Sequence, residues 1–463
     1  MLKIRYSPHT FIRHCDGESL IWHRRNYASL ILRDAEPFLK SISRDYHDVN
    51  QIIVHLANCF GTDPNGIVDD FYDFISPLIE NGLAETQGSR ETLDPSVSNE
   101  GTVASSNNRP SGDENPFADF YLRHNIPREL HIDLTSACTE RCVHCYIAEY
   151  HSCLEFELIR KALTEFRDLG GMTVYVSGGE CMLHPRFGDV LHECRKLDLN
   201  MIVLSNLTLC CDETIELLKE VDPHFVKVSL YSMDPGHHDA ITRLPGSWHK
   251  TMEAFLKLES NGIPLELASP VLKENQYDFA DLAAFAEEHH VYLVTNPNIF
   301  AKCNHDNLNL EHALSPDEFR RFLEKHYLML NRTYAERIFH PEERLCDVGT
   351  IRLCLNSEGN YYPCDGCHGL ILGNVKEHTI REVWNGEPLE RLRKLKQKDF
   401  PRCLKCVKRS YCKICLAENF SATGDILQIP EGACKYSGVR REFYGKLNAD
   451  MNKAERSHAA EII

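Results

Sequence analysis

Apolar runs alternate with amphipathic stretches between about residues 118 and 300. This alternation predicts parallel β-strands joined by crossover helices, because each parallel pair needs a long connection. The predicted strands span residues 130–134, 173–176, 201–204, 225–230, 265–271 and 291–295. The carboxyl ends of such strands form one face, where barrel enzymes place their sites. Polar residues at these ends are therefore candidate ligand contacts: Ser205, Asn206, Ser229 and Asn275.

The first 86 residues show a different pattern. Short β-like pieces at 11–13 and 19–23 flank the turn signal Asp16-Gly17. Three helical patterns follow, at 34–43, 48–60 and 63–81. Apolar residues recur at core spacing in the second and third patterns, at Ile52, Ile53, Leu56, Phe60, Ile67, Phe71, Phe74, Ile75, Leu78 and Ile79. A small sheet with three helices predicts a winged-helix-like α+β domain.

Residues 87–116 are rich in Ser, Gly, Asn, Pro, Thr and Glu and almost free of apolar side chains. Such a segment cannot bury a core, so we expect a flexible linker between domains. Its root-mean-square span would be about 30 Å. The predicted organisation is the winged-helix-like N-terminal domain (1–86), the linker (87–116), a barrel (117–330), a cysteine-rich domain (331–445) and a tail (446–463).

Composition narrows the possible functions. The 463-residue chain has a formal net charge of -17, which disfavours binding to nucleic acid or an anionic membrane. No apolar run approaches the roughly 18 residues of a membrane span, and the start lacks a signal-peptide pattern. Twenty cysteines without an export signal indicate metal or redox chemistry rather than disulfides. We therefore expect a cytoplasmic metalloprotein.

One short loop concentrates the candidate chemistry. It carries the thiols of Cys138, Cys142 and Cys145 at intervals of four and three positions. Three thiolates suit a 4Fe–4S cluster with one iron left open, whereas a Cys₃His zinc site would also use His144. A β-like run at 172–176 then leads into Ser177-Gly178-Gly179-Glu180. Glycines there allow close approach of a ligand to the backbone, and the glutamate offers a carboxylate to a cation.

The loop followed by the Gly-Gly-Glu strand resembles the radical S-adenosylmethionine (radical SAM) superfamily. The resemblance implies a partial (β/α)₆ barrel, a 4Fe–4S cluster on the three loop cysteines, and S-adenosylmethionine (SAM) on the open iron. It further implies that Ser177, Gly178, Gly179 and Glu180 contact SAM, and that Arg243 faces its carboxylate or lies on the surface. Cleavage of SAM would yield a 5'-deoxyadenosyl radical.

A second array of cysteines follows, consisting of Cys346, Cys364, Cys403, Cys406, Cys412, Cys415 and Cys434. Paired C-x-x-C units are also typical of zinc ribbons. The full pattern, with Gly359 and Trp384, resembles the SPASM domain, except that Cys412 and Cys415 are one residue closer than usual. The resemblance implies two auxiliary 4Fe–4S clusters. One would use Cys346, Cys364 and Cys415, with Cys367 or a substrate thiolate as fourth ligand; the other would use Cys403, Cys406, Cys412 and Cys434.

The remaining chemistry-bearing residues divide into two groups. Asp365 resembles the proposed base of sulfatase-maturing enzymes. Cys181 and Cys303 are expected near the barrel mouth, where Cys303 or Cys181 would be a hydrogen donor. The other cysteines are expected to be small buried residues: Cys15, Cys59, Cys153, Cys194, Cys210, Cys211 and Cys354.

Winged helices often bind DNA, but residues 1–86 hold eight Lys/Arg against twelve Asp/Glu. In front of a radical SAM core, the segment instead resembles the pyrroloquinoline quinone (PQQ) chaperone family, which implies recognition of a peptide leader as an added strand. The combined resemblance implies oxidative cross-linking of a ribosomal precursor peptide, by a thioether or a carbon–carbon bond. Sulfatase-type oxidation, epimerisation and a non-enzymatic zinc scaffold are the alternatives. An electron donor such as flavodoxin or ferredoxin is implied.

Overall fold

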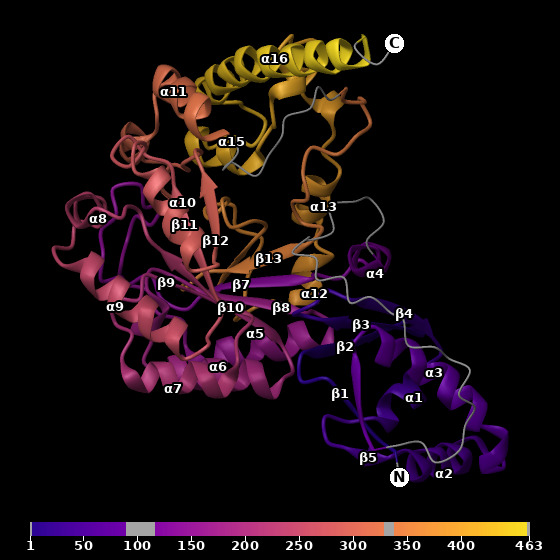
Figure 1. Ribbon diagram of the computed structural model, residues 1–463. Coiled ribbons are helices and arrows are strands. Elements are labelled where there is room, and N and C mark those ends of the chain that lie inside the picture. Colours follow the sequence, from indigo (N-terminus) through magenta and orange to yellow (C-terminus); the bar gives the residue numbers. More distant parts are fainter. Residues whose placement is uncertain (1, 89–115, 328–337, 461–463) are drawn as a thin grey trace. The chain divides into compact units, whose positions relative to one another are not determined.

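The computed structural model describes residues 2–88, 116–327 and 338–460 (Figure 1). The chain divides into two compact units. Unit 1 comprises Met1–Arg128 with the short segments Arg167–Met172 and Asp198–Asn200, and unit 2 comprises the remainder. Residues 89–115 of the predicted linker lie outside the described residues. Among the described residues, no helix combines the length and apolarity that crossing a membrane requires.

Unit 1 contains two antiparallel three-stranded sheets and four α-helices. The sheet orders are β5-β1-β6 and β2-β3-β4. The strands are β1 (Lys3–Tyr6), β2 (Thr10–Cys15), β3 (Glu18–His23), β4 (Ser29–Arg33), β5 (His47–Asp48) and β6 (Ala84–Gln87). The helices are α1 (Glu36–Ser41), α2 (Val49–Phe60), α3 (Val68–Glu80) and α4 (Pro116–His124), with a 3₁₀ turn at Pro64–Gly66. The β2–β3 hairpin and the first three helices were predicted; β1, β4, β5 and β6 were not.

Helix α2 shows how the sequence defines these elements. The Asp48 carboxylate accepts the Asn50 N–H at 2.9 Å and caps the helix start. Gly61 ends the helix in the left-handed conformation, at φ 65°. Its inner face buries Ile52, Ile53 and Leu56 as expected, but Phe60 is 49% exposed. The expectation for Phe60 was wrong, because the last turn before Gly61 runs past the edge of the core.

Helix α4 belongs to unit 1 rather than to the barrel. Phe120 and Tyr121 on α4 are buried in one cluster with Phe11, Leu20 and Trp22 of the β2–β3 hairpin. The compact unit therefore extends past the predicted boundary at residue 86 and takes in residues on both sides of the predicted linker.

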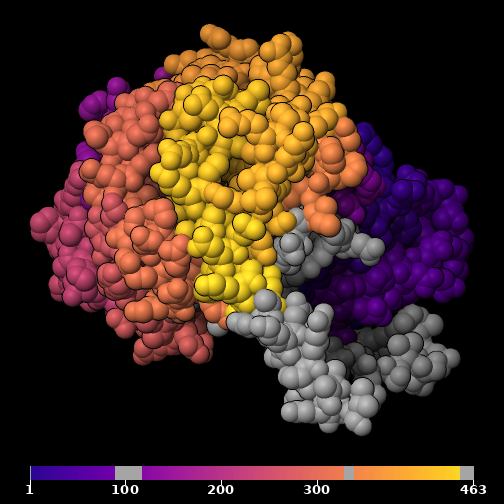
Figure 2. All heavy atoms as spheres, turned by 90° about the horizontal axis from the view of Figure 1, so that it is seen from above, coloured from indigo at the N-terminus to yellow at the C-terminus, as the bar shows by residue number. Residues whose placement is uncertain are grey.

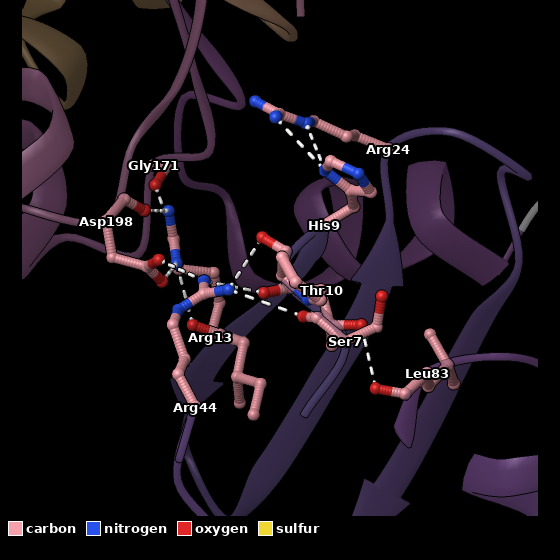
Figure 3. A network of polar contacts seen from close by, with 11 residues as sticks. Ser7, His9, Thr10, Arg13, Arg24, Arg44, Leu83, Gly171 and Asp198 are labelled. Atoms are coloured by element: carbon pink, nitrogen blue, oxygen red, sulfur yellow. Dashed lines mark hydrogen bonds and ion pairs between the residues drawn. The ribbon is translucent and has the colours of Figure 1, made fainter. Parts of the chain in front are cut away.

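Two arginines of unit 1 converge on Asp198 (Figure 3). The fully buried Arg13 donates to the carbonyls of Gly171 at 2.6 Å and Asp198 at 2.7 Å. Arg44 donates to the Asp198 carboxylate at 2.5 Å and to the Thr10 carbonyl at 2.8 Å. Burial lowers the pKa of Arg13 to about 10, which still leaves it protonated. Strand β2 is thereby fixed to the segments that precede two strands of unit 2.

Unit 2 is built on a parallel sheet with the order β12-β11-β10-β9-β8-β7, which confirms the predicted partial barrel. The strands are β7 (Glu129–Asp133), β8 (Thr173–Ser177), β9 (Asn200–Ser205), β10 (Phe225–Ser229), β11 (Leu265–Pro270) and β12 (Tyr292–Asn296). The crossover and following helices are α5 (Phe156–Asp168), α6 (Phe187–Lys196), α7 (Asp212–Val221), α8 (Pro235–Thr242), α9 (Ser247–Ser260), α10 (Phe279–Glu288) and α11 (Pro316–His326). Short 3₁₀ helices lie at Cys181–Leu183 and Leu308–His312.

The cysteine-rich region continues the same sheet. Strand β13 (Arg352–Leu355) pairs in parallel with β7, and β14 (Asn360–Tyr362) and β15 (Gly373–Asn374) follow in antiparallel order. The sequence did not predict this extension.

The rest of the described region is mainly helical and ends in the long helix α16 (Glu431–Ala460). This helix lies across the upper face of unit 2 (yellow in Figure 2). The helices of this region are α12 (Ile380–Trp384), α13 (Glu387–Arg393), α14 (Pro401–Leu404), α15 (Leu416–Thr423) and α16 (Glu431–Ala460), with 3₁₀ turns at Gln397–Asp399 and Arg409–Tyr411. Helix α16 also runs through the predicted boundary at residue 445.

Candidate active site

The three-cysteine loop begins five residues after β7 and is fixed by backbone hydrogen bonds to α8. The Arg141 N–H donates to the Thr242 carbonyl and the Val143 N–H donates to the Ile241 carbonyl, both at 2.9 Å. These bonds hold the middle of the loop against the end of a neighbouring crossover helix. The loop conformation is thus set by the fold before any ligand binds.

The three thiols of the loop lie close enough to affect one another electrostatically. Burial, together with smaller effects of acidic groups that include the Cys145 thiol, raises the pKa of Cys138 to about 12. Burial also raises the pKa of Cys142 and Cys145, and the Cys145 thiol contributes to the shift at Cys142. Thiols in such surroundings ionise only when a metal binds them. Three converging half-buried thiols fit three irons of a 4Fe–4S cluster.

The His144 ring packs edge-on against Tyr231, with 5.1 Å between ring centroids. Burial lowers its pKa to about 4, with a smaller contribution from His312. This packing role of His144 favours the cluster over zinc.

The glycines after β8 allow the strand extension to lie directly against the loop. A Cβ on Gly178 would stand 2.3 Å from the Thr135 carbonyl oxygen, and one on Gly179 would stand 2.4 Å from that of Ala137. Gly178 also has φ +139°, which disfavours any side chain. The Gly179 and Glu180 N–H groups donate to Thr135 and Ala137 at 2.7 and 2.8 Å. Only glycine permits this contact.

Glu180 braces two strand ends. Its fully buried carboxylate accepts from Ser205 Oγ and the Asn206 N–H, both at 2.8 Å, and from the Met182 N–H at 3.1 Å. These contacts join the ends of β8 and β9 through Glu180, and its expected contact with SAM stays a prediction. Asn206 extends this brace to the loop, donating to Thr139 Oγ1 at 3.1 Å.

The other strand-end candidates, Ser229 and Asn275, both contact Tyr231. Ser229 interacts with Tyr231, and the buried Asn275 holds its own turn by donating to the carbonyls of Tyr231 and Pro270 at 2.9 and 3.0 Å. Arg243 is exposed directly after Thr242. These contacts make Asn275 a structural residue and leave Arg243 accessible beside the loop.

Glu140 is a site residue that the sequence reasoning missed. It lies inside the loop, only 3% exposed, and accepts a hydrogen bond from the Cys142 thiol at 3.2 Å. Burial raises its pKa to about 7, and its Oε1 atom has no hydrogen-bond partner among the described residues. The available signal was an acidic residue between two cysteines of the loop.

The second array forms two groups of thiols. Cys364 affects the pKa of Cys346, Cys367 and Cys415, so these four lie together. Cys412 affects both Cys403 and Cys434, and Cys406 lies near the same two thiols. Two separate sets of four thiols match the ligand number of two 4Fe–4S clusters. Cys367 thus lies where a fourth ligand of the first set is needed.

Three further candidates differ in their surroundings. Although burial raises the pKa of Asp365, the Arg352 guanidinium, 2.5 Å away, brings it below its usual value. Cys303 lies near Cys145, and its N–H donates to the Tyr146 carbonyl. Cys181 is fully buried, with its thiol 3.2 Å from the Leu204 carbonyl at the carboxyl end of β9.

The expectation of burial for the remaining cysteines was only partly correct. Cys194 and Cys354 are buried, Cys15 and Cys210 are half-buried, and three are exposed: Cys59, Cys153 and Cys211.

A cavity of about 550 Å³ lies between the strand ends and the cysteine-rich region. Ser177 and Leu204 line it from β8 and β9. Asp365, Cys415 and Glu418 line it from the other side. A bound molecule of a few residues would therefore contact the ends of the barrel strands and one thiol of the second array together.

A partial parallel barrel with a three-thiol loop, joined to two four-thiol groups, defines a radical SAM/SPASM enzyme. Residues 132–286 match the model of the radical SAM superfamily, and residues 346–407 match that of the SPASM iron–sulfur cluster-binding domain. The chain thus carries both domains, and its cofactors are 4Fe–4S clusters and SAM.

Among characterised proteins, the chain is 25% identical over 346 residues to the AdoMet-dependent heme synthase of Methanosarcina barkeri, covering 67% of this chain and 97% of that protein. It is 24% identical over 397 residues to the antilisterial bacteriocin subtilosin biosynthesis protein AlbA of Bacillus subtilis, covering 80% and 81%. In structure it resembles Streptococcus suis SuiB bound to precursor peptide SuiA, with a TM-score of 0.61, 16% identity, and coverage of 93% of this chain and 99% of that one.

Proposed function

We propose that this enzyme forms an oxidative cross-link within a ribosomally made precursor peptide, with a thioether from a peptide cysteine as first choice and a carbon–carbon bond as second. The observation that carries the proposal is the cavity bounded by Ser177 and Leu204 on one side and Cys415 on the other. A peptide residue held there lies between the SAM-binding end of the barrel and an auxiliary thiol group. The similarity to AlbA and to SuiB with its precursor peptide supports a peptide as substrate.

The protein groups around this cavity have separable tasks. Bound SAM and its cluster supply an abstracting radical when reduced by a donor such as flavodoxin or ferredoxin. The brace of Glu180, Ser205 and Asn206 fixes the two strand ends that face the cofactor. Arg352 holds Asp365 ionised at the cavity wall, where this carboxylate can accept the proton of a peptide thiol.

The proposed thioether reaction is balanced as a two-electron oxidation. A C–H bond and an S–H bond of the peptide break, and one C–S bond forms. The carbon-bound hydrogen would leave as a hydrogen atom, which the radical supplied by bound SAM would take up, and the thiol proton would go to Asp365. The remaining electron would go to an auxiliary cluster held by Cys346, Cys364, Cys367 and Cys415.

Unit 1 is proposed to hold the leader of the precursor. Strands β2, β4, β5 and β6 each lie at an edge of a three-stranded sheet, where an extended peptide can add as a further strand. The net negative charge of residues 1–86 argues against a DNA-binding alternative.

Co-expression with a short cysteine-containing peptide encoded beside the gene tests the reaction. The product should be lighter than the precursor by two hydrogen atoms and contain one fewer alkylatable thiol. A product of unchanged mass carrying a solvent-derived deuteron would indicate epimerisation, with Cys303 rather than the buried Cys181 as donor. Conversion of a single residue without a cross-link would indicate a sulfatase-maturase-type oxidation.

Removal of the leader from the peptide tests the task of unit 1. We expect the leaderless peptide to be modified with a much higher KM and a similar kcat, because binding rather than chemistry is weakened. Equal KM values for the two peptides would refute leader recognition. The cross-link assignment would survive that result, since it depends on the product mass alone.

A further inference from the structure

Three donor groups meet at the tip of the β2–β3 hairpin in unit 1, away from the cysteines of the two arrays. Cys15, Asp16 and His124 each offer a ligand atom within 4.8 Å of the other two. Nδ1 of His124 lies 3.4 Å from Oδ2 of Asp16, and the Cys15 thiol lies 3.7 Å from the same oxygen. Distances of this size separate neighbouring ligands around one small metal ion.

The other ring nitrogen of His124 contacts a second carboxylate, that of Glu18. Nε2 lies 3.1 Å from Oε2 of Glu18. With Nε2 directed at Glu18, Nδ1 is the ring nitrogen of His124 that is directed at Asp16.

A ring nitrogen, a carboxylate oxygen and a sulfur that face one another at these distances can serve as the ligands of one cation. A histidine that binds a metal usually donates its other N–H to a carboxylate, which fixes the tautomer, and Glu18 supplies that carboxylate. The His124 side chain is only 10% exposed, so its orientation is set by packing, including contact with Phe120 at 4.7 Å between ring centroids. Asp16 is 85% exposed and leaves the group open to water on one side.

We propose that Cys15, Asp16 and His124 form a zinc site with Glu18 supporting the histidine, and that water fills the fourth position. Imidazole, thiolate and carboxylate together are ligands that zinc accepts in tetrahedral geometry. Binding releases the Cys15 thiol proton to solvent. The ion would connect the hairpin turn to the end of α4, and so link the two parts of unit 1 that flank residues 89–115. This site is independent of the radical chemistry.

Zinc content of the full-length enzyme with its clusters assembled tests the site. The protein is incubated with zinc sulfate, separated by gel filtration, and measured by inductively coupled plasma mass spectrometry. The wild-type enzyme should retain one more zinc per chain than Cys15→Ser and His124→Gln. Zinc should also raise the unfolding temperature of the wild type and not that of the two variants.

Cys59 and His55 provide a matched control, because they form a Cys–His contact of 3.7 Å on α2 and, among the described residues, have no ion pair with a carboxylate. Cys59→Ser and His55→Gln should bind zinc as the wild type does. Equal zinc in all five proteins would overturn the site and leave His124 with Asp16 and Glu18 as its polar partners. If the site variants fail to fold, X-ray absorption at the zinc edge of the zinc-loaded wild-type protein identifies the ligands instead. One sulfur at about 2.3 Å and one nitrogen at about 2.0 Å are expected, and absence of the sulfur overturns the proposal.

Discussion

Replacement of Gly179 by alanine should selectively disable the SAM-binding cluster. The new Cβ would lie 2.4 Å from the Ala137 oxygen and 2.5 Å from the Ser136 oxygen, both backbone atoms that cannot rotate away. Residues 136–137 must then move. The loop begins at the next residue, Cys138, so its thiol moves with them.

The size of this effect follows from the contacts that are lost. The bonds Gly179 N–H to Thr135 and Glu180 N–H to Ala137 each contribute about 1 kcal/mol. Steric strain in a packed site adds about 1–3 kcal/mol. The local penalty is about 3–5 kcal/mol, enough to displace a short loop while the barrel core remains folded. The expected result is loss of one cluster from a protein that is otherwise intact.

Iron content, electron paramagnetic resonance after reduction, and deoxyadenosine production measure the outcome. Gly179→Ala should lose about four irons per chain, the content of one cluster, together with SAM cleavage. Gly432→Ala is the control, because a Cβ there meets nothing within 4 Å. It should keep all iron and be slightly more stable, since alanine favours a helix over glycine. Full iron and normal SAM cleavage in Gly179→Ala would refute the reasoning.

Other variants test the remaining conclusions about the clusters, the fold and unit 1. Replacing all three loop cysteines by alanine should abolish SAM cleavage and leave a folded protein that still binds iron in the auxiliary groups. Complete loss of iron would contradict independent clusters. Cys367→Ala should deplete iron in the first auxiliary group, because its thiol lies beside Cys364 and Cys415, and unchanged cluster content would instead indicate an iron open to substrate. Arg13→Met should destabilise the fold by about 3–5 kcal/mol in chemical denaturation, since it leaves buried carbonyls unpaired. The control is Arg33→Met, which changes a side chain that is 79% exposed and should lower the free energy of unfolding by under about 1 kcal/mol. An equal loss of stability in the two variants would refute the anchoring role of Arg13. Deletion of residues 1–86 should retain SAM cleavage without peptide while modification of the full precursor collapses, and unchanged modification would exclude a leader-binding role.

The sequence was sufficient where one local pattern determines the structure. The six barrel strands were predictable because each is an apolar run between helical patterns, and the loop was predictable from the spacing of Cys138, Cys142 and Cys145. The cluster and SAM assignments followed from these motifs together, and the matches to the two domain models agree with them.

The sequence was insufficient where partners lie far apart in the chain. Strand β13 is short and pairs with β7 across more than two hundred residues, and nothing in its four residues identifies that partner. Glu180 shows the same limit, because its role depends on Ser205 and on the backbone of Asn206. Exposure of Phe60 and Cys59 depends on where the core ends, which helical spacing does not show.

The pairing of β13 with β7 imposes an order on assembly during translation. Arg352 binds Glu129 at 2.7 Å across 223 residues, so the edge of β7 stays open until residue 355 has left the ribosome. The cysteine loop directly follows β7 and depends on its position. Iron–sulfur insertion into a finished site therefore comes after synthesis of the barrel and of the first strand beyond it. Nascent chains that stop before β13 present an unpaired strand edge, the feature that promotes aggregation. Slow translation through residues 338–355 would lengthen the time spent in that state.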